Sequence, residues 1–136
     1  MGFMTWTEDM SVGVFVLDND HKKLIGIINQ LHFGIMAGHK REILAAVLDH
    51  LVDYAKSHFA REEALLLRAK YPDSAEHKLD HERFVNEIAL LRERFKSAPA
   101  AEIDQELMEF LSNWIVMHVQ VSDKLYGPRL NARGIY

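Results

Sequence analysis

The chain has 136 residues, of which 49% are hydrophobic and 26% are charged, as is ordinary for one soluble globular domain. Its 16 Lys and Arg and 20 Asp and Glu give a net charge of −4 with no basic stripe, which argues against nucleic acid or an anionic membrane as a partner. It has no cysteine, no apolar run long enough to cross a bilayer and no signal-peptide pattern, so we expect a cytoplasmic protein without disulfides or thiolate metal sites.

The first 17 residues are expected to form an extended arm laid on an apolar surface, because the run over residues 12–16 is mostly β-branched. Asp18 is then expected to cap a first helix that extends to about Ala37, with Gly38 closing it. Apolar residues recur in this helix at steps of four and three, which predicts one inward stripe. His21 heads that stripe, and its apolar members are Leu24, Ile28, Leu31 and Ile35.

A second helix is predicted over residues 41–69, followed by a break at Tyr71-Pro72, because proline disfavours helix in the residue before it. Asp73 and Glu76 have the spacing of a capping box for a third helix that ends near Lys96. The inward stripe of the second helix is Val47, Leu51, Tyr54, His58, Glu62 and Leu65, and that of the third is His77, His81, Phe84, Ile88, Leu91 and Phe95.

Residues 97–101 read as a linker before a fourth helix that ends near Tyr126, where Gly127-Pro128 stops it and leaves a short polar tail over 127–136. Four helices with short connections predict an all-α, antiparallel up-down-up-down four-helix bundle over residues 18–126. Arm, bundle and tail are expected to form one domain over 1–136. The inward stripe of the fourth helix is Leu107, Leu111, Trp114, His118, Val121 and Leu125.

Five histidines fall at the same end of such a bundle, each on an inward stripe. Buried imidazoles need polar partners, and a bound metal would supply them. Glu62 lies one turn after His58 on the same face, whereas Asp123 would be rotated by about 140° from His118 in an ideal helix and is a weak candidate from geometry alone. The five histidines are His21, His58, His77, His81 and His118.

Other polar residues are expected to stay outside this cluster. His32 lies about 16 Å along the first helix from His21, and His50 about 12 Å along the second from His58, at 1.5 Å per residue. We expect these two histidines and His39 to be structural or exposed. The carboxylates expected on a solvated face are Glu63, Asp80 and Glu82.

Imidazole and carboxylate without thiolate suit iron, manganese or zinc, and the number of ligands favours two ions. If both carboxylates bridge them, together with a solvent-derived oxygen, three histidines saturate one ion and two leave the other with an open position for dioxygen. A ferritin-like site needs Glu-x-x-His twice, which is absent, and a zinc-protease helix needs glutamate where Lys78 stands. A plain bundle with polar core histidines remains the alternative.

Several segments together resemble the hemerythrin family, and specifically the single-domain bacterial hemerythrins. The resemblance covers nearly the whole chain. The segments that carry it are Trp6 with 11–14, residues 18–21, residues 58–63, residues 71–73 with His77 and His81, and Trp114 with His118 and Asp123.

The resemblance implies two iron ions per chain, bridged by an oxo or hydroxo group, Glu62 and Asp123. The iron that takes oxygen would be held by His21 and His58, and the helix near Asp123 would be locally distorted. The saturated iron would be held by His77, His81 and His118, and the oxygen pocket would be walled by Phe59, Trp114, Ile115 and Val119.

The implied function is reversible dioxygen binding for storage, transport or delivery, without catalysis, with an oxygen-consuming enzyme as a possible recipient. Oxygen or redox sensing, di-iron peroxidase or oxidase activity, and iron storage are the alternatives. Two residues depart from the family pattern: Asp20 stands where a longer polar residue is common, and Val119 stands where isoleucine is usual.

Overall fold

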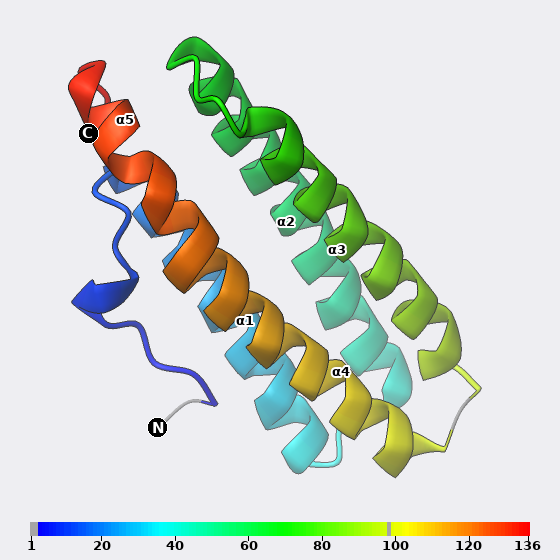
Figure 1. Ribbon diagram of the computed structural model, residues 1–136. Coiled ribbons are helices and arrows are strands. Elements are labelled where there is room, and N and C mark those ends of the chain that lie inside the picture. Colours follow the sequence, from blue (N-terminus) through cyan, green and yellow to red (C-terminus); the bar gives the residue numbers. More distant parts are fainter. Residues whose placement is uncertain (1–2, 98) are drawn as a thin grey trace.

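A computed structural model describes residues 3–97 and 99–136, and only the backbone of residues 120–122. The described residues are helical and contain no strand. The four long helices lie side by side as a bundle, as predicted, with α1 against α2, α2 against α3, α3 against α4 and α4 against α1 (Figure 1). The elements are η1 (Glu8–Met10), α1 (Phe15–Met36), α2 (Arg41–Arg68), α3 (Ser74–Phe95), α4 (Ala100–Trp114), the π-helical η2 (Ile115–Ser122), η3 (Asp123–Tyr126) and α5 (Gly127–Ala132).

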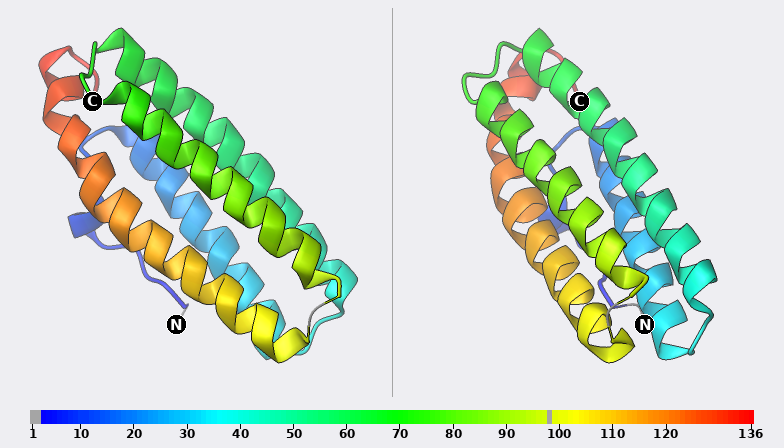
Figure 2. Two further views of the ribbon diagram at one scale, coloured as in Figure 1. Left: turned by 45° about the vertical axis from the view of Figure 1, so that its right-hand side comes forward. Right: turned by 90° about the vertical axis from the view of Figure 1, so that its right-hand side faces the viewer.

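The N-terminal arm runs along the outside of the bundle before entering α1 (Figure 2). α1 begins at Phe15, so the prediction that Asp18 caps its start was wrong. The Asp18 carboxylate instead accepts hydrogen bonds from Ser11 Oγ at 2.5 Å and from the backbone amide of Val12 at 2.8 Å. It therefore fastens the arm to the first turn of the helix.

The predicted inward stripe of α3 is buried at every position, because that helix is regular throughout. In α2 the prediction was less accurate, since Leu51 is buried whereas Val47, Tyr54 and Leu65 are only partly so. Asp73 precedes α3 as expected, but its side chain makes no capping hydrogen bond, so the predicted capping box is absent. Gly38 closes α1 with a φ of +72°.

The predicted end of the fourth helix differs most from the structure. Leu125 is 67% exposed, whereas its neighbour Tyr126 is fully buried. Gly127-Pro128 opens α5 instead of starting a polar tail, because proline suits the first turn of a helix. A second, smaller apolar core lies at this end and joins the arm, α2 and α5 through Val12, Val14, Leu17, Leu66, Ala69, Tyr126, Leu130 and Ile135.

The main apolar core fills the rest of the bundle and reaches Phe59, Ile115 and Val119. A layer of buried polar side chains lies between the two cores. None of the helices in the described part of the chain is both long and apolar enough to span a membrane.

Candidate metal centre

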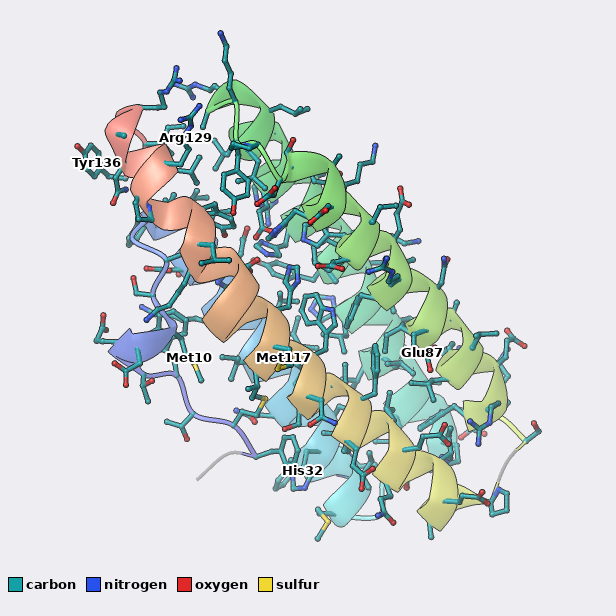
Figure 3. The ribbon with its side chains drawn as sticks, in the orientation of Figure 1. Met10, His32, Glu87, Met117, Arg129 and Tyr136 are labelled. Atoms are coloured by element: carbon teal, nitrogen blue, oxygen red, sulfur yellow. The ribbon has the colours of Figure 1, made fainter. Side chains whose placement is uncertain are left out.

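All five histidines singled out in the sequence, with Glu62 and Asp123, meet inside the bundle. Each is at most 5% exposed. Nitrogen- and oxygen-bearing side chains gather between the helices toward the end where Arg129 lies, while His32 lies toward the opposite end (Figure 3). His21 comes from α1, His58 and Glu62 from α2, His77 and His81 from α3, His118 from η2, and Asp123 from η3.

Glu62 presents its two oxygens to different histidines. Its Oε1 lies 2.5 Å from Nε2 of His77 and 3.0 Å from Nε2 of His81. Its Oε2 lies 3.0 Å from Nε2 of His58 and 3.6 Å from Nε2 of His21. The carboxylate therefore stands between two sets of imidazoles.

Asp123 divides its oxygens in the same way. Its Oδ1 lies 2.8 Å from Nε2 of His77 and 3.0 Å from Nε2 of His118, while its Oδ2 lies 3.1 Å from Nε2 of His21. In an ideal α-helix Asp123 would point away from His118. The π-helical segment brings Asp123 back to the side of His118. Its hydrogen bonds join residues five positions apart, so those two residues lie one above the other on the same face. The distortion expected from the resemblance is therefore present.

The donor atoms form two overlapping groups, and within each group they lie within 4.8 Å of one another. Both groups contain only imidazole nitrogens and carboxylate oxygens, which suit iron, manganese or zinc. The two Asp123 oxygens are buried and lack a hydrogen bond of acceptable geometry, although histidine nitrogens lie close to them. Buried polar atoms of this kind need a partner, and cations would supply it. One group is His77, His81, His118 and Glu62, and the other is His21, His58, Glu62 and Asp123.

The two buried carboxylates shift the pKa values of the histidines around them. Burial alone would lower the pKa of His21 and of His77, but the negative charge of the adjacent Asp123 and Glu62 carboxylates raises both to about 10. The same competition raises the pKa of His118 to about 9. Because imidazoles bind cations in their neutral form, cation binding would release any proton that these histidines carry.

Two histidines are held from behind by carboxylates. With Nε2 of each ring facing the cluster, Nδ1 of His58 donates to Asp20 Oδ2 at 3.0 Å and Nδ1 of His81 donates to Glu63 Oε2 at 2.9 Å. Such partners fix the orientation of an imidazole and raise its basicity. Glu63, which we expected only on a solvated face, is partly exposed but also binds His81, a contact that the sequence did not predict. Glu63 directly follows Glu62 and lies off the inward stripe of its helix, so the periodic pattern does not indicate this contact.

Tyr126 is a further residue that sequence reasoning missed. Its hydroxyl is buried and donates to Glu62 Oε2 at 3.1 Å. The stripe predicted for a regular α-helix selected Leu125 instead, because the π segment shifts the register of everything after it. Tyr126 packs its ring against His77 at a centroid distance of 5.5 Å.

The four residues expected to wall an oxygen pocket lie beside the cluster. Phe59 stacks on His81 with centroids 3.9 Å apart, and Trp114 stacks on His118 at 4.4 Å. Both aromatic rings thus cover the three-histidine side, and Phe59 also contacts His58 with ring centroids 5.7 Å apart. Ile115 and Val119 are each 1% exposed and belong to the apolar core.

The other histidines lie outside the cluster. His39 and His50 are exposed, and the partly buried His32 stacks on Phe3.

Comparison with known proteins identifies this arrangement. Residues 12–130 match the hemerythrin HHE cation binding domain. The chain belongs to the hemerythrin family. It is 38% identical over 133 residues to a bacteriohemerythrin of Methylococcus capsulatus, covering 97% of this chain and 100% of that protein. It is 36% identical over 132 residues to a bacteriohemerythrin of Stenotrophomonas maltophilia, covering 97% and 84% respectively.

Solved structures agree with this assignment. A crystal structure of wild-type hemerythrin superposes with a TM-score of 0.85 at 36% identity, covering 94% of this chain and 98% of that one. The fold predicted from periodicity is therefore that of solved hemerythrins. The family and the buried donor set together support a non-haem di-iron protein.

Proposed function

We propose that this hemerythrin binds dioxygen reversibly at a di-iron centre, for oxygen storage, transport or delivery to an oxygen-consuming enzyme, and that it is a carrier rather than an enzyme. The proposal rests mainly on the orientation of two carboxylates, whose oxygens face different sets of histidines. Glu62 and Asp123 each direct one oxygen to one set of histidines and the other oxygen to the second set. Two bridging carboxylates of this kind suit a pair of cations.

The two sets of histidines are unequal, and this asymmetry favours small-molecule binding. Besides the shared carboxylates, one set has three imidazoles and the other has two, His21 and His58. The two-histidine side would hold its ion with one position left for an external ligand. A ferrous pair, when bound, supplies that position and the two electrons that reversible oxygen uptake requires. The three-histidine side would be held by His77, His81 and His118.

Protein groups around the centre favour retention over turnover. Ile115 and Val119 are almost fully buried, and apolar walls of this kind restrict water and protons. Tyr126 donates to Glu62 Oε2 and helps hold that carboxylate in the orientation that divides its oxygens between the two sets of histidines. Asp20 and Glu63 orient His58 and His81 in the same manner. Together these contacts fix the donor atoms before any ion arrives.

Oxygen uptake by the anaerobic ferrous protein tests the proposal. We expect dioxygen uptake that saturates in proportion to the bound iron and release when oxygen is removed, with no steady consumption of hydrogen peroxide in the presence of a reductant. Continuous peroxide or oxygen consumption would favour a peroxidase or oxidase and contradict carriage. Iron far in excess of two per chain would favour storage. Oxidation without any release of oxygen would favour a sensor.

A further inference from the structure

The two carboxylates behind the histidines differ in their charge environment. Asp20, behind His58, is 5% exposed and has a cation attached to it. Arg61 donates from Nε to Oδ2 at 2.9 Å and from Nη2 to Oδ1 at 2.8 Å, and the Tyr54 hydroxyl donates to Oδ1 at 2.7 Å. Asp20 therefore has its negative charge balanced by a bidentate ion pair.

Glu63, behind His81, has no comparable clamp. Its side chain is 25% exposed, and within the described part of the chain its only ion pair is with His81. The carboxylate on this side is therefore screened by solvent, whereas that on the His58 side is screened by a guanidinium. His58 belongs to the two-histidine set and His81 to the three-histidine set. The two sets therefore differ in the charge that lies behind one of their histidines.

A carboxylate behind a metal-bound imidazole makes that imidazole a stronger electron donor, which stabilises the more highly charged, oxidised ion. A bidentate arginine on the carboxylate opposes this, because it withdraws charge through strong hydrogen bonds. The Arg61 side chain is 42% exposed, but the Asp20 side chain that it pairs with is 6% exposed, so its positive charge lies at the edge of the interior, where Coulomb interactions are stronger than in water. Both effects favour the ferrous state.

We propose that Arg61 is a positioning residue that, through Asp20 and His58, favours the reduced state of the ion on the two-histidine side and so slows autoxidation. Among the described residues, the Arg61 side chain makes no hydrogen bond or ion pair with Glu62, Asp123 or any of the five histidines, so Asp20 is its link to them by contact. The proposal rests on the di-iron function proposed above. Tyr54 supports Arg61 because its hydroxyl donates to Oδ1 of Asp20, the oxygen that Nη2 of Arg61 also binds.

Two substitutions on this ion pair have opposite expected effects. Arg61→Gln leaves Asp20 unbalanced, so we expect a lower midpoint reduction potential of the iron-loaded protein and a several-fold faster decay of its oxygenated form. Asp20→Asn removes the negative charge behind His58, so we expect a higher potential. Arg61→Lys keeps the positive charge but not the pair of parallel hydrogen bonds. The reduction potential of this variant is expected to lie near that of the unmodified protein.

The chain offers a matched control. Arg92 makes a similar bidentate pair with Asp49 at 2.8 and 3.2 Å, on residues that contact no member of the centre. Arg92→Gln is expected to leave the potential and the decay rate unchanged. Thermal unfolding of each metal-free variant measures any purely structural effect.

Spectroelectrochemical titration of the iron-loaded variants decides the matter. Opposite shifts for Arg61→Gln and Asp20→Asn support the proposal. A potential for Arg61→Gln equal to that of Arg92→Gln, or shifts of both pair variants in the same direction, would overturn it while the di-iron function stands. If Arg61→Gln does not fold, Asp20→Asn decides alone, and an unchanged or lowered potential overturns the proposal. Failure of the unmodified protein to bind two irons would defeat both the function and this inference.

Discussion

The backbone amide of Asp123 donates a hydrogen bond to the carbonyl oxygen of His118, five residues earlier. This π-type bond places Asp123 Oδ1 3.0 Å from Nε2 of His118, and Oδ2 near His21. A regular helix would turn the carboxylate about 140° away. The irregular segment is thus what completes the donor set, in keeping with the frequent location of π turns at functional sites.

Asp123→Asn keeps the shape of this side chain and removes its charge. We expect iron content to fall below two per chain and reversible oxygenation to be lost, because one of the two carboxylates proposed to hold both ions is gone. Even changes behind the ligands typically cost on the order of 10-fold or more in metal affinity. Metal analysis after equilibrium dialysis measures the effect. Asp80→Asn, at a surface ion pair with Arg83, is the control and should retain full iron content.

The metal-free protein should lose stability as pH rises. The folded-state pKa values of His21 and His77, about 10, lie above the unfolded value of 6.5. Their contribution to the free energy of unfolding is therefore complete below pH 6.5 and is lost as pH rises toward 10. Thermal unfolding of metal-free protein across this range should show a falling midpoint. A midpoint that rises over the same range would contradict the assignment of protonated histidines.

Val119→Ile should slow autoxidation of the oxygenated protein. Val119 is 1% exposed in the core beside the centre, and one more methylene would fill space that water needs to enter. We expect a several-fold slower first-order decay, followed in the visible spectrum. Equal or faster decay in the isoleucine variant would show that this position does not limit access. Thermal unfolding controls for overpacking, which typically costs about 1–3 kcal/mol.

Gly127→Ala should destabilise the end of the bundle. A Cβ at this position would clash with the backbone oxygen of Val12, which cannot move aside as a flexible side chain can. We expect a loss of about 1–3 kcal/mol in the free energy of unfolding, as for other overpacked sites. Chemical denaturation measures it. Gly26→Ala, where an added Cβ meets nothing within 4 Å in the middle of α1, should instead be neutral or stabilising.

Periodicity alone predicted much of this molecule, because α3 is regular and its stripe carries two of the five histidines. The heights of His21, His58 and His118 followed from the antiparallel order of the helices. What failed was local: beyond Trp114 the π segment shifts the register, so that Leu125 was chosen in place of Tyr126 and Asp123 looked misplaced. A regular 3.6-residue period carries no signal for such a segment.

Contacts between distant residues were the other class of error. The Asp18 carboxylate binds the arm, Glu63 binds His81, and Asp20 joins His58 to Arg61. Each of these carboxylates lies off the apolar stripe that periodicity predicts for its helix. Their partners come from other helices or from the arm, and sequence spacing within one helix does not specify such pairs.

The central claim is tested most directly by iron content measured together with the visible absorption spectrum of anaerobic ferrous protein, before oxygen is added, after it is added and after it is removed. We predict about two irons per chain, the number that the two donor groups imply, and an absorption band that appears with oxygen and disappears without it. Protein that binds no iron, or that binds two irons and never shows a reversible band, would contradict it.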